Sequence, residues 1–527
     1  MIIVSEFMIT PPSDQKSKET TGMPFSFDLP SVQGTGVQNQ ETIVVPPQGE
    51  AAPAASPSDI PVVENPAGSP SSGGVPFSVS VPSPQQPGNP WPKRIIIILI
   101  LLVAVIAAVV LGRIAFTKFT EPKEVTITYW GLWENDGIIQ PIIAEFEASH
   151  PKIKVQYSKQ SHKQYRERLQ ASIDRGDGPD LFRFHNMWVP MLKNQLSPIP
   201  ETVMTSTTFK ELYYPSAVND LIGGQTIYGI PLMVEGLGLY YNEDIFAAAG
   251  IIAPPATWEE LLAIVPKISK PEGNGFAVSA IALGTTGNIE NFSDILATMF
   301  MQNGTNLAIP KGTEADTTLA FYHKFANPAD PIYSWNETMD NSMYAFANGK
   351  VAMIFAPSWR AFDIVDMAKQ VNPTLKFKVA PIPQLAGNTV TWSSYWAEGI
   401  SEKSKYKEAA AEFLTFLISR ETMIKLYAQE SKIRLFGEPY ARMDMANLLS
   451  NDPYAGPFVT QAKDARSFPL ASRTFDNGIN DRMIKYLENA VNAVNTGSSP
   501  QQELDTVANG FSQVLTSYGL VTNTASQ

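Results

Sequence analysis

The stretch Val125-Thr-Ile-Thr-Tyr-Trp130 opens a β-α-β pattern in this chain of 527 residues. Its apolar residues alternate with polar ones, as in a half-buried strand. The apolar residues from Ile139 to Phe146 then recur at helical spacing, and Ile153-Lys-Val-Gln-Tyr157 alternates again. A strand, a helix and a second strand in this order predict an α/β fold, in which helices cover the faces of a largely parallel sheet.

The same alternation of strands and helices continues over residues 124–520. A further helix is expected to end at Gly176-Asp-Gly-Pro-Asp180, after which Leu181-Phe-Arg-Phe184 resumes as a strand. Later helices are expected to begin at Thr257-Trp-Glu-Glu260 and at Ser499-Pro-Gln-Gln502, which are N-terminal capping sequences. A segment of nearly 400 residues is too long for one hydrophobic core, so two lobes are expected.

The chain before this globular part has two sections. Residues 1–92 are rich in Pro, Ser, Gly and Gln, and this composition predicts a disordered tail. Ile95 to Leu111 is an unbroken run of 17 apolar residues, which predicts a transmembrane helix over residues 93–116 and a linker over residues 117–123. A cleaved signal peptide is the competing interpretation. An uncleaved anchor is favoured, because the run is longer than the apolar region of a typical signal peptide and a 94-residue leader replaces the short basic segment that begins one.

Positive charges flank the apolar run on both sides, so they do not decide its orientation. Lys93 and Arg94 precede the run, and Arg113, Lys118 and Lys123 follow it. A cytoplasmic N-terminus is expected, which places residues 124–520 on the other side of the membrane.

One short motif occurs twice in the tail. The segment from Gly22 to Gln33 is echoed by the segment from Gly74 to Gln85. The echo is either a repeated docking motif for a cytoplasmic partner or a coincidence of biased composition.

Composition excludes several classes of function. The chain has 39 Lys and Arg against 51 Asp and Glu, a net charge of -12, which argues against nucleic acid as a partner. It has no cysteine and no paired-histidine zinc motif, and no cofactor or metal is expected. It also has no phosphate-binding loop for ATP, so any ATP-driven step needs a separate protein.

Residues 124–520 resemble a known family, the extracellular solute-binding proteins of the maltose-binding type. The resemblance covers essentially the whole globular part and rests on motifs in the family's order. These are the strand at Val125, the turn Gly176-Asp-Gly-Pro-Asp-Leu-Phe182, the segment Tyr228 to Asn242, the segment Ala345 to Ile354 with Pro357-Ser-Trp359, Lys378-Val-Ala-Pro-Ile-Pro383, and the helix Ala409 to Ile418.

The resemblance implies a two-lobed fold of the type II periplasmic-binding-protein kind. One lobe would comprise about residues 124–234 and 397–445, and the other about 235–396 and 446–520. The implied function is to bind a small molecule, presumed to be a mono- or oligosaccharide, outside the cytoplasm. The membrane-anchored protein would deliver it to an ABC importer with its own permease and ATPase.

Sugar binding in water requires flat aromatic surfaces together with planar polar groups. Both kinds of residue are concentrated where the family places its cleft. The expected ligand-binding residues are His185, Asn186, Trp188, Glu235, Asn288, Glu290, Trp359, Arg360, Tyr395, Trp396, Arg473 and Phe475. Gly236 and Gly238 are expected to act as a hinge, because glycine permits unusual backbone torsions.

Several alternatives remain open on the sequence alone. Arg360 could hold an acidic sugar or pair with a carboxylate across the cleft. Glu235 and Glu290 could act as the two carboxylates of a glycoside hydrolase, although no catalytic motif accompanies them. The chain could also serve as a membrane-anchored sensor, or bind a polyamine, a peptide or a phosphorylated polyol.

Overall fold

The computed structural model describes residues 91–120 and 123–520. They belong to two separate units, helix α2 and the globular part, and each is described by itself. The predicted disordered tail and its repeated motif lie outside the described residues, apart from Trp91 and Pro92, which begin helix α2.

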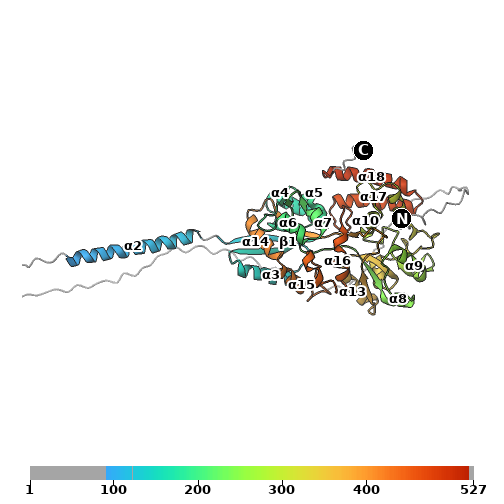
Figure 1. Ribbon diagram of the computed structural model, residues 1–527, viewed down its shortest axis with the longest axis horizontal. Helices are drawn as coiled ribbons and strands as arrows, with labels where there is room; N and C mark the ends of the chain where they lie inside the picture. The colour runs from blue at the N-terminus through green and yellow to red at the C-terminus, as the bar shows by residue number, and fades with distance from the viewer. Residues whose placement is uncertain (1–90, 121–122, 521–527) are drawn as a thin grey trace, which may run out of the picture. The chain divides into compact units, whose positions relative to one another are not determined.

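Helix α2 (Trp91–Thr120, blue in Figure 1) contains the apolar run found in the sequence. Its segment Ile95–Arg113 has a mean hydropathy of 3.6 over 19 residues, and none of it is buried within the protein. At about 1.5 Å per residue, such a segment approaches the thickness of a hydrocarbon core. By length and composition, α2 can therefore cross a membrane.

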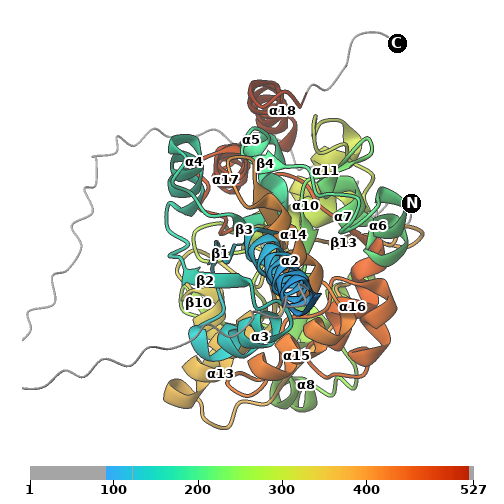
Figure 2. The same ribbon diagram turned by 90° about the vertical axis from the view of Figure 1, so that its left-hand side faces the viewer.

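The first sheet of the globular part has the strand order β2-β1-β3-β14-β4, with β7 also paired to β14. Strands β1, β2 and β3 run parallel, and β14 runs antiparallel to β3; the first three lie side by side in Figure 2. Its strands are β1 (Val125–Gly131), β2 (Ile153–Lys159), β3 (Leu181–His185), β4 (Leu196–Ser197), β7 (Ile230–Pro231) and β14 (Trp396–Ser401).

Helices cover this sheet. Phe146 from α3 and Phe413 from α14 form ring contacts with each other, and Phe413 also contacts Tyr129 of β1. The helices and short elements of this part are α3 (Asp136–Ser149), α4 (Tyr165–Arg175), η1 (Asn186–Trp188), α5 (Val189–Leu192), α6 (Ser206–Leu212), α7 (Pro215–Leu221), β5 (Ile222–Gly223), β6 (Thr226–Ile227), α14 (Lys407–Leu417) and α15 (Arg420–Glu430).

The second sheet has the order β12-β8-β11-β10-β9. Its strands are β8 (Gly238–Asn242), β9 (Lys270–Glu272), β10 (Gly275–Ile281), β11 (Val351–Ala356) and β12 (Phe377–Ala380). Its helices are α8 (Glu243–Ala248), α9 (Trp258–Ile268), α10 (Phe292–Gln302), α11 (Thr313–Lys324), α12 (Ser342–Ala347), α13 (Arg360–Val371), α17 (Ile479–Asn495) and α18 (Pro500–Ser517). Helices α17 and α18 lie side by side in both views (Figures 1 and 2).

The helix starts follow the capping sequences. The hydroxyl of Thr257 accepts a hydrogen bond from the amide of Glu260, and the hydroxyl of Ser499 accepts one from the amide of Gln502. Gly176 ends α4 with a φ of 84°, a conformation that favours glycine. These local predictions are confirmed.

Three stretches connect the two sheets. Residues 232–237 lead from β7 to β8, and residues 381–395, which include β13 (Thr391–Trp392), lead from β12 to β14. The third follows α15 and contains η2 (Met443–Leu448), α16 (Gly456–Gln461), η3 (Ala462–Asp464) and β15 (Ala465–Arg466). Strands β13 and β15 pair in parallel. The prediction of a two-lobed α/β fold is confirmed.

Gly236 of the first connection and Gly238 at the start of β8 are required by close packing and do not adopt unusual backbone torsions. Neither Gly236 nor Gly238 has a positive φ. A Cβ atom on Gly236 would overlap the carbonyl oxygen of Trp392, and one on Gly238 would lie 2.7 Å from the ring of Phe458. Close packing between connections therefore requires glycine here, and the hinge role stays a prediction.

Candidate functional site

A cavity of about 340 Å³ lies between the two lobes, and both lobes and the connections line it. From the first lobe, Trp133 and His162, which follow β1 and β2, and His185, the last residue of β3, reach it. The three strands are parallel, so their carboxyl ends meet at one edge of the sheet. In open α/β sheets, this edge is where ligands bind.

The first-lobe wall of the cavity consists of Trp133, His185 and Trp396. Trp396 is paired in register with His185, and its ring packs edge-on against His185 and Trp133 at centroid distances of 5.2 and 5.4 Å. The imidazole of His185 is 3.0 Å from the hydroxyl of Ser394. Burial lowers the pKa of His185 to about 3, so its ring is neutral at physiological pH.

A buried ionic triad lies directly behind this wall. Arg183 donates to Glu398 at 2.7 Å and to both oxygens of Glu134, at 2.6 and 2.8 Å. All three side chains are only 1% exposed. Alternate residues of a strand share a face, so Arg183 and Glu398 lie on the same face of the sheet as His185 and Trp396. They are the next pair along that face of the two strands, away from the cavity.

The second-lobe wall consists of Trp359, Arg473 and Phe475. The guanidinium of Arg473 lies 5.8 Å from the Trp359 ring centre and 5.7 Å from that of Phe475. Arg473 also pairs with Glu290 at 2.8 Å. Arg473 and Phe475 have positive φ values of 60° and 49°, a strained backbone region for such residues.

The two walls meet at one rim of the cavity. His162, which follows β2, has its ring 5.3 Å from that of Phe475. Next to this contact, Arg166 of α4 donates to the carbonyl of Asp476 at 2.6 Å, and Asn477 donates to Glu167 at 2.8 Å. These contacts join the lobes in the conformation described.

The first connection places Glu235 in the cavity. Its carboxylate accepts hydrogen bonds from the amide of Ser358, at 3.1 Å, and from the Ser358 hydroxyl. The residue is only 6% exposed. Burial and the nearby charge of Glu438 raise the pKa of Glu235 to about 8.

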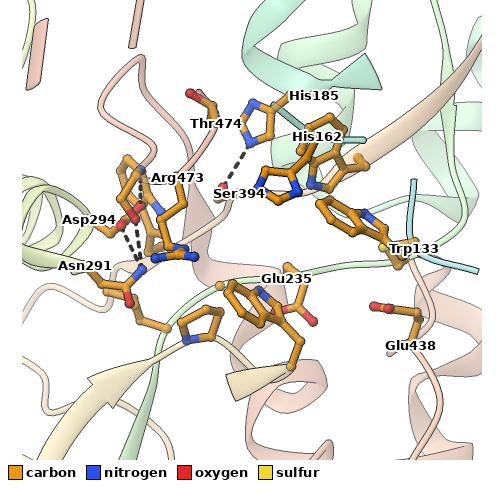
Figure 3. Close-up of a pocket in the computed structure, with 18 of the residues that line it drawn as sticks. Trp133, His162, His185, Glu235, Asn291, Asp294, Ser394, Glu438, Arg473 and Thr474 are labelled. Carbon is orange, nitrogen blue, oxygen red and sulfur yellow. Dashed lines mark hydrogen bonds between the residues drawn. The ribbon is translucent and has the colours of Figure 1, made fainter. Parts of the chain in front are cut away.

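Opposite ends of the cavity carry different polar groups. Asn291, Asp294 and Arg473 lie at one end, and Trp133 and Glu438 lie at the other (Figure 3). Asp294 accepts from Asn291 at 3.2 Å and from the Ser472 amide at 3.1 Å, and burial raises its pKa to about 6. Among the described residues, no cluster of His, Asp and Glu could hold a metal ion.

Of the twelve residues predicted to bind ligand, the structure brings six to the cavity. They are His185, Glu235, Trp359, Trp396, Arg473 and Phe475. Gly236 lines the cavity and Gly238 does not. Ligand contact by these residues stays a prediction.

The other six predicted residues do not line the cavity. Trp188 is fully buried beside Tyr165. Asn186 and Tyr395 both donate to Asp220, at 2.8 Å each. Tyr395 precedes Trp396, and successive side chains of an extended segment point to opposite sides, so only one of the two can face the cavity.

The remaining three of these six have structural partners. Asn288 donates to the carbonyls of Asn336 and Met339, at 2.9 and 3.0 Å. Arg360 pairs with Glu290 and, at 2.7 Å, with Asp363. Arg360 is therefore held by carboxylates of its own lobe.

Sequence reasoning missed several residues that line the cavity. The most informative are Trp133, His162, Asn291, Trp392 and Glu438. Trp133 and His162 directly follow predicted strands, as His185 does, so the same reasoning applied to every strand would have found them. No comparable signal marks Glu438, which comes from an irregular segment after α15.

Comparisons with known proteins agree with this geometry. The family model for bacterial extracellular solute-binding proteins matches residues 132–424. A binding protein of Brucella abortus is 26% identical over 340 residues, covering 62% of this chain and 78% of the relative. The multiple sugar-binding protein of Streptococcus mutans is 24% identical over 338 residues, covering 61% and 78%.

A solved structure shows the same fold. The sugar-binding protein MalE of Xanthomonas citri superimposes with a TM-score of 0.61 at 19% identity, covering 76% of this chain and all of that one. With a family match over more than half of its length, this chain belongs to the bacterial extracellular solute-binding protein family.

Proposed function

We propose that the protein captures a saccharide in the cavity between its lobes and delivers it to an ABC importer. The observation that carries the proposal is the composition of the cavity lining. Four indole side chains, from Trp133, Trp359, Trp392 and Trp396, line one cavity together with amide, hydroxyl and carboxylate groups. Indole rings match the apolar faces of a sugar ring, and the polar groups can replace the water partners of its hydroxyls.

The relatives support the same ligand class. The Streptococcus mutans relative is named a multiple sugar-binding protein, and a Bacillus subtilis relative is named a galactooligosaccharide-binding protein. One solved structure with the same fold, at a TM-score of 0.58, is complexed with maltotetraose. The glycoside hydrolase alternative has less support, because Glu290 does not line the cavity and is paired with Arg360 and Arg473.

Helix α2 serves in this proposal as an uncleaved membrane anchor with a cytoplasmic N-terminus. The apolar segment of 19 residues and the length of chain before it support an anchor. Digestion of residues 124–520 by protease added to intact cells is the expected result. Protection of these residues would contradict the orientation.

Calorimetric titration of the full chain in detergent against neutral oligosaccharides tests the ligand class. Micromolar binding is expected, and Trp359→Ala should abolish most of it. Tyr406→Ala is the control, because Tyr406 is exposed and does not line the cavity. A response to polyamines or peptides, with none to any saccharide, would overturn the sugar assignment.

A further inference from the structure

Negative charge accumulates at the end of the cavity where Glu235 and Glu438 lie. In Figure 3 their carboxyl groups point toward one another. The charged side chains packed together around this end and behind it, among the described residues, are five glutamates and two arginines: Glu134, Glu235, Glu398, Glu430, Glu438, Arg183 and Arg434. Carboxylates therefore outnumber guanidiniums there.

Both arginines of this group are already held by other carboxylates. Arg183 is enclosed by Glu134 and Glu398 in the buried triad. Arg434 pairs with Glu430 at 2.6 Å and with Glu438 at 2.9 Å. Within the described part of the chain, Glu235 forms no ion pair, and its carboxyl group is held by hydrogen bonds from Ser358 and from the backbone of Gly236. A buried carboxylate that faces a cavity without a cation favours a ligand that brings one.

We propose that the ligand is a saccharide that carries a protonated amine, bound against Glu235 and Glu438. This inference rests on the proposed function and narrows its ligand class. An ammonium group bound there would donate a charge-assisted hydrogen bond to Glu235, which has no ion-pair partner, and would share Glu438 with Arg434. A neutral hydroxyl could accept or donate a hydrogen bond at the same place, but it would gain no charge-assisted contact with Glu235.

The aromatic residues next to Glu235 suit a cation as well. Trp359 directly follows Ser358, the residue that donates to Glu235, and the Trp392 carbonyl lies against Gly236. Both indoles line the cavity. Indole faces attract ammonium groups electrostatically, and more strongly where water is excluded.

The same charges oppose an acidic ligand. Arg434 and Arg473 line the cavity, and each is paired with a carboxylate of the protein, Arg473 with Glu290 at 2.8 Å. A phosphate or carboxylate would have to displace these partners and would also face the carboxylate of Glu438. Like charges in a site of low dielectric repel strongly, so phosphorylated and acidic sugars are expected to bind poorly.

Binding of an amine should also release a proton. The groups around Glu235 are Glu438 and Arg434 after α15, Tyr240 of β8, and Ser358 before α13, and Arg360 is a further neighbour of Tyr240. Burial and Glu438 hold the pKa of Glu235 at about 8, so at neutral pH the free site is largely protonated. An incoming ammonium keeps its own proton and favours the carboxylate, so Glu235 gives its proton to the buffer.

The test compares each neutral saccharide that binds the full chain with its amino-sugar counterpart and with the N-acetylated form of that counterpart. Calorimetric titration at neutral pH, in two buffers of different ionisation enthalpy, gives affinity and proton release together. The amine should bind about tenfold more tightly or better, since hydrogen bonds to charged groups are worth about 1.5–3 kcal/mol. Only the amine should release a proton.

Two variants test whether Glu235 causes the amine preference and the proton release. Glu235→Gln keeps the shape of the side chain and should abolish both the amine preference and the proton release. Asp366→Asn is the matched control, because Asp366 is a carboxylate of helix α13 that lies outside the cavity and pairs with Lys369 at 2.8 Å. That variant should keep the preference.

The outcomes separate the two proposals. If neutral saccharides bind and their amine counterparts bind no more tightly, the amine inference is overturned and the saccharide function stands. If Glu235→Gln keeps the preference, Glu235 is not the seat of the amine and the inference is overturned as well. If no saccharide binds in any form, the proposed function itself fails. Proton release in the unmodified protein decides the question even if a variant does not fold.

Discussion

The two walls of the cavity are held in place by charges of very different burial. Behind the first-lobe wall, Glu134, Arg183 and Glu398 are each 1% exposed. Beside the second-lobe wall, Arg360 has carboxylate partners that are much more exposed, Glu290 at 28% and Asp363 at 46%. A buried charge network allows few alternative arrangements, whereas exposed pairs exchange readily with water.

This difference indicates that the first wall is held more firmly than the second. The first-lobe wall stands on paired strands and a buried triad, so it presents its rings in one orientation before ligand arrives. The second-lobe wall lies on a loop with two residues at positive φ and on the start of α13. We infer that closure adjusts the second wall against a first wall that stays unchanged.

The largest expected effect is the difference in stability loss when the arginine of each charge network is replaced. Arg183→Met should lower the free energy of unfolding by about 3–5 kcal/mol, because it leaves two carboxylates buried without a cation. Arg360→Met should cost about 1 kcal/mol or less, because its partner carboxylates remain in contact with water. Denaturant unfolding of the globular part measures both. Equal losses would mean that the two walls do not differ in this way.

The next largest effect is a contrast between Trp188 and Trp359, which were both predicted to bind ligand. Trp188 is fully buried and does not line the cavity, so Trp188→Ala should destabilise the protein by about 3 kcal/mol or more. Trp359 lines the cavity, so Trp359→Ala should mainly lower saccharide affinity, by about tenfold. Melting curves and titrations of both variants make the comparison. A large loss of stability in Trp359→Ala would place that ring in the core instead.

Most of the fold and part of the cavity lining were predictable from the sequence. The β/α order and the capping boxes follow from periodicity and turn residues, which are local properties of the chain. The two lobes follow from the length of the globular part and from the family resemblance. The cavity residues that were predicted well sit at strand ends, as His185 does, or beside a connection, as Glu235 does. Position at a strand end places His185, whereas the family resemblance places Glu235 at the crossing between the lobes.

The rest of the site depends on contacts that periodicity does not encode. Trp188 follows His185 by one 3₁₀ turn, and that turn directs its ring into the core. Glu438 reaches the cavity from an irregular segment that is held by its ion pair with Arg434. Arg360 adjoins Trp359 and still misses the cavity, because Glu290 and Asp363 hold it. Each of these outcomes depends on a tertiary partner.

Glu235, on the connection between the two walls, should make the unfolding free energy depend on pH. The pKa of Glu235 is about 8 in the folded protein and near its ordinary 4.5 when unfolded, so the folded state binds the proton more tightly. The stabilising contribution of Glu235 is therefore complete below about pH 4.5 and is lost as pH rises toward 8. Glu235→Gln should flatten the fall in unfolding free energy over this interval. An unchanged pH profile in that variant would contradict the assignment.

The smallest effect concerns the rim where the lobes touch. Phe475 is 41% exposed, and its ring contacts His162 of the opposite lobe. Phe475→Ala should change the unfolding free energy by about 0.5 kcal/mol or less, as is usual for exposed positions. Saccharide affinity should nevertheless fall a few-fold, because the closed state loses a ring contact worth about 0.5–1.5 kcal/mol.

The matching change on the first lobe, His162→Ala, should weaken affinity to a similar degree. If the two variants together weaken binding no more than either alone, the effect arises from the contact between the lobes, since truncating either ring already removes that contact. If the two losses simply add, each ring acts on the ligand separately and the rim does not couple the walls.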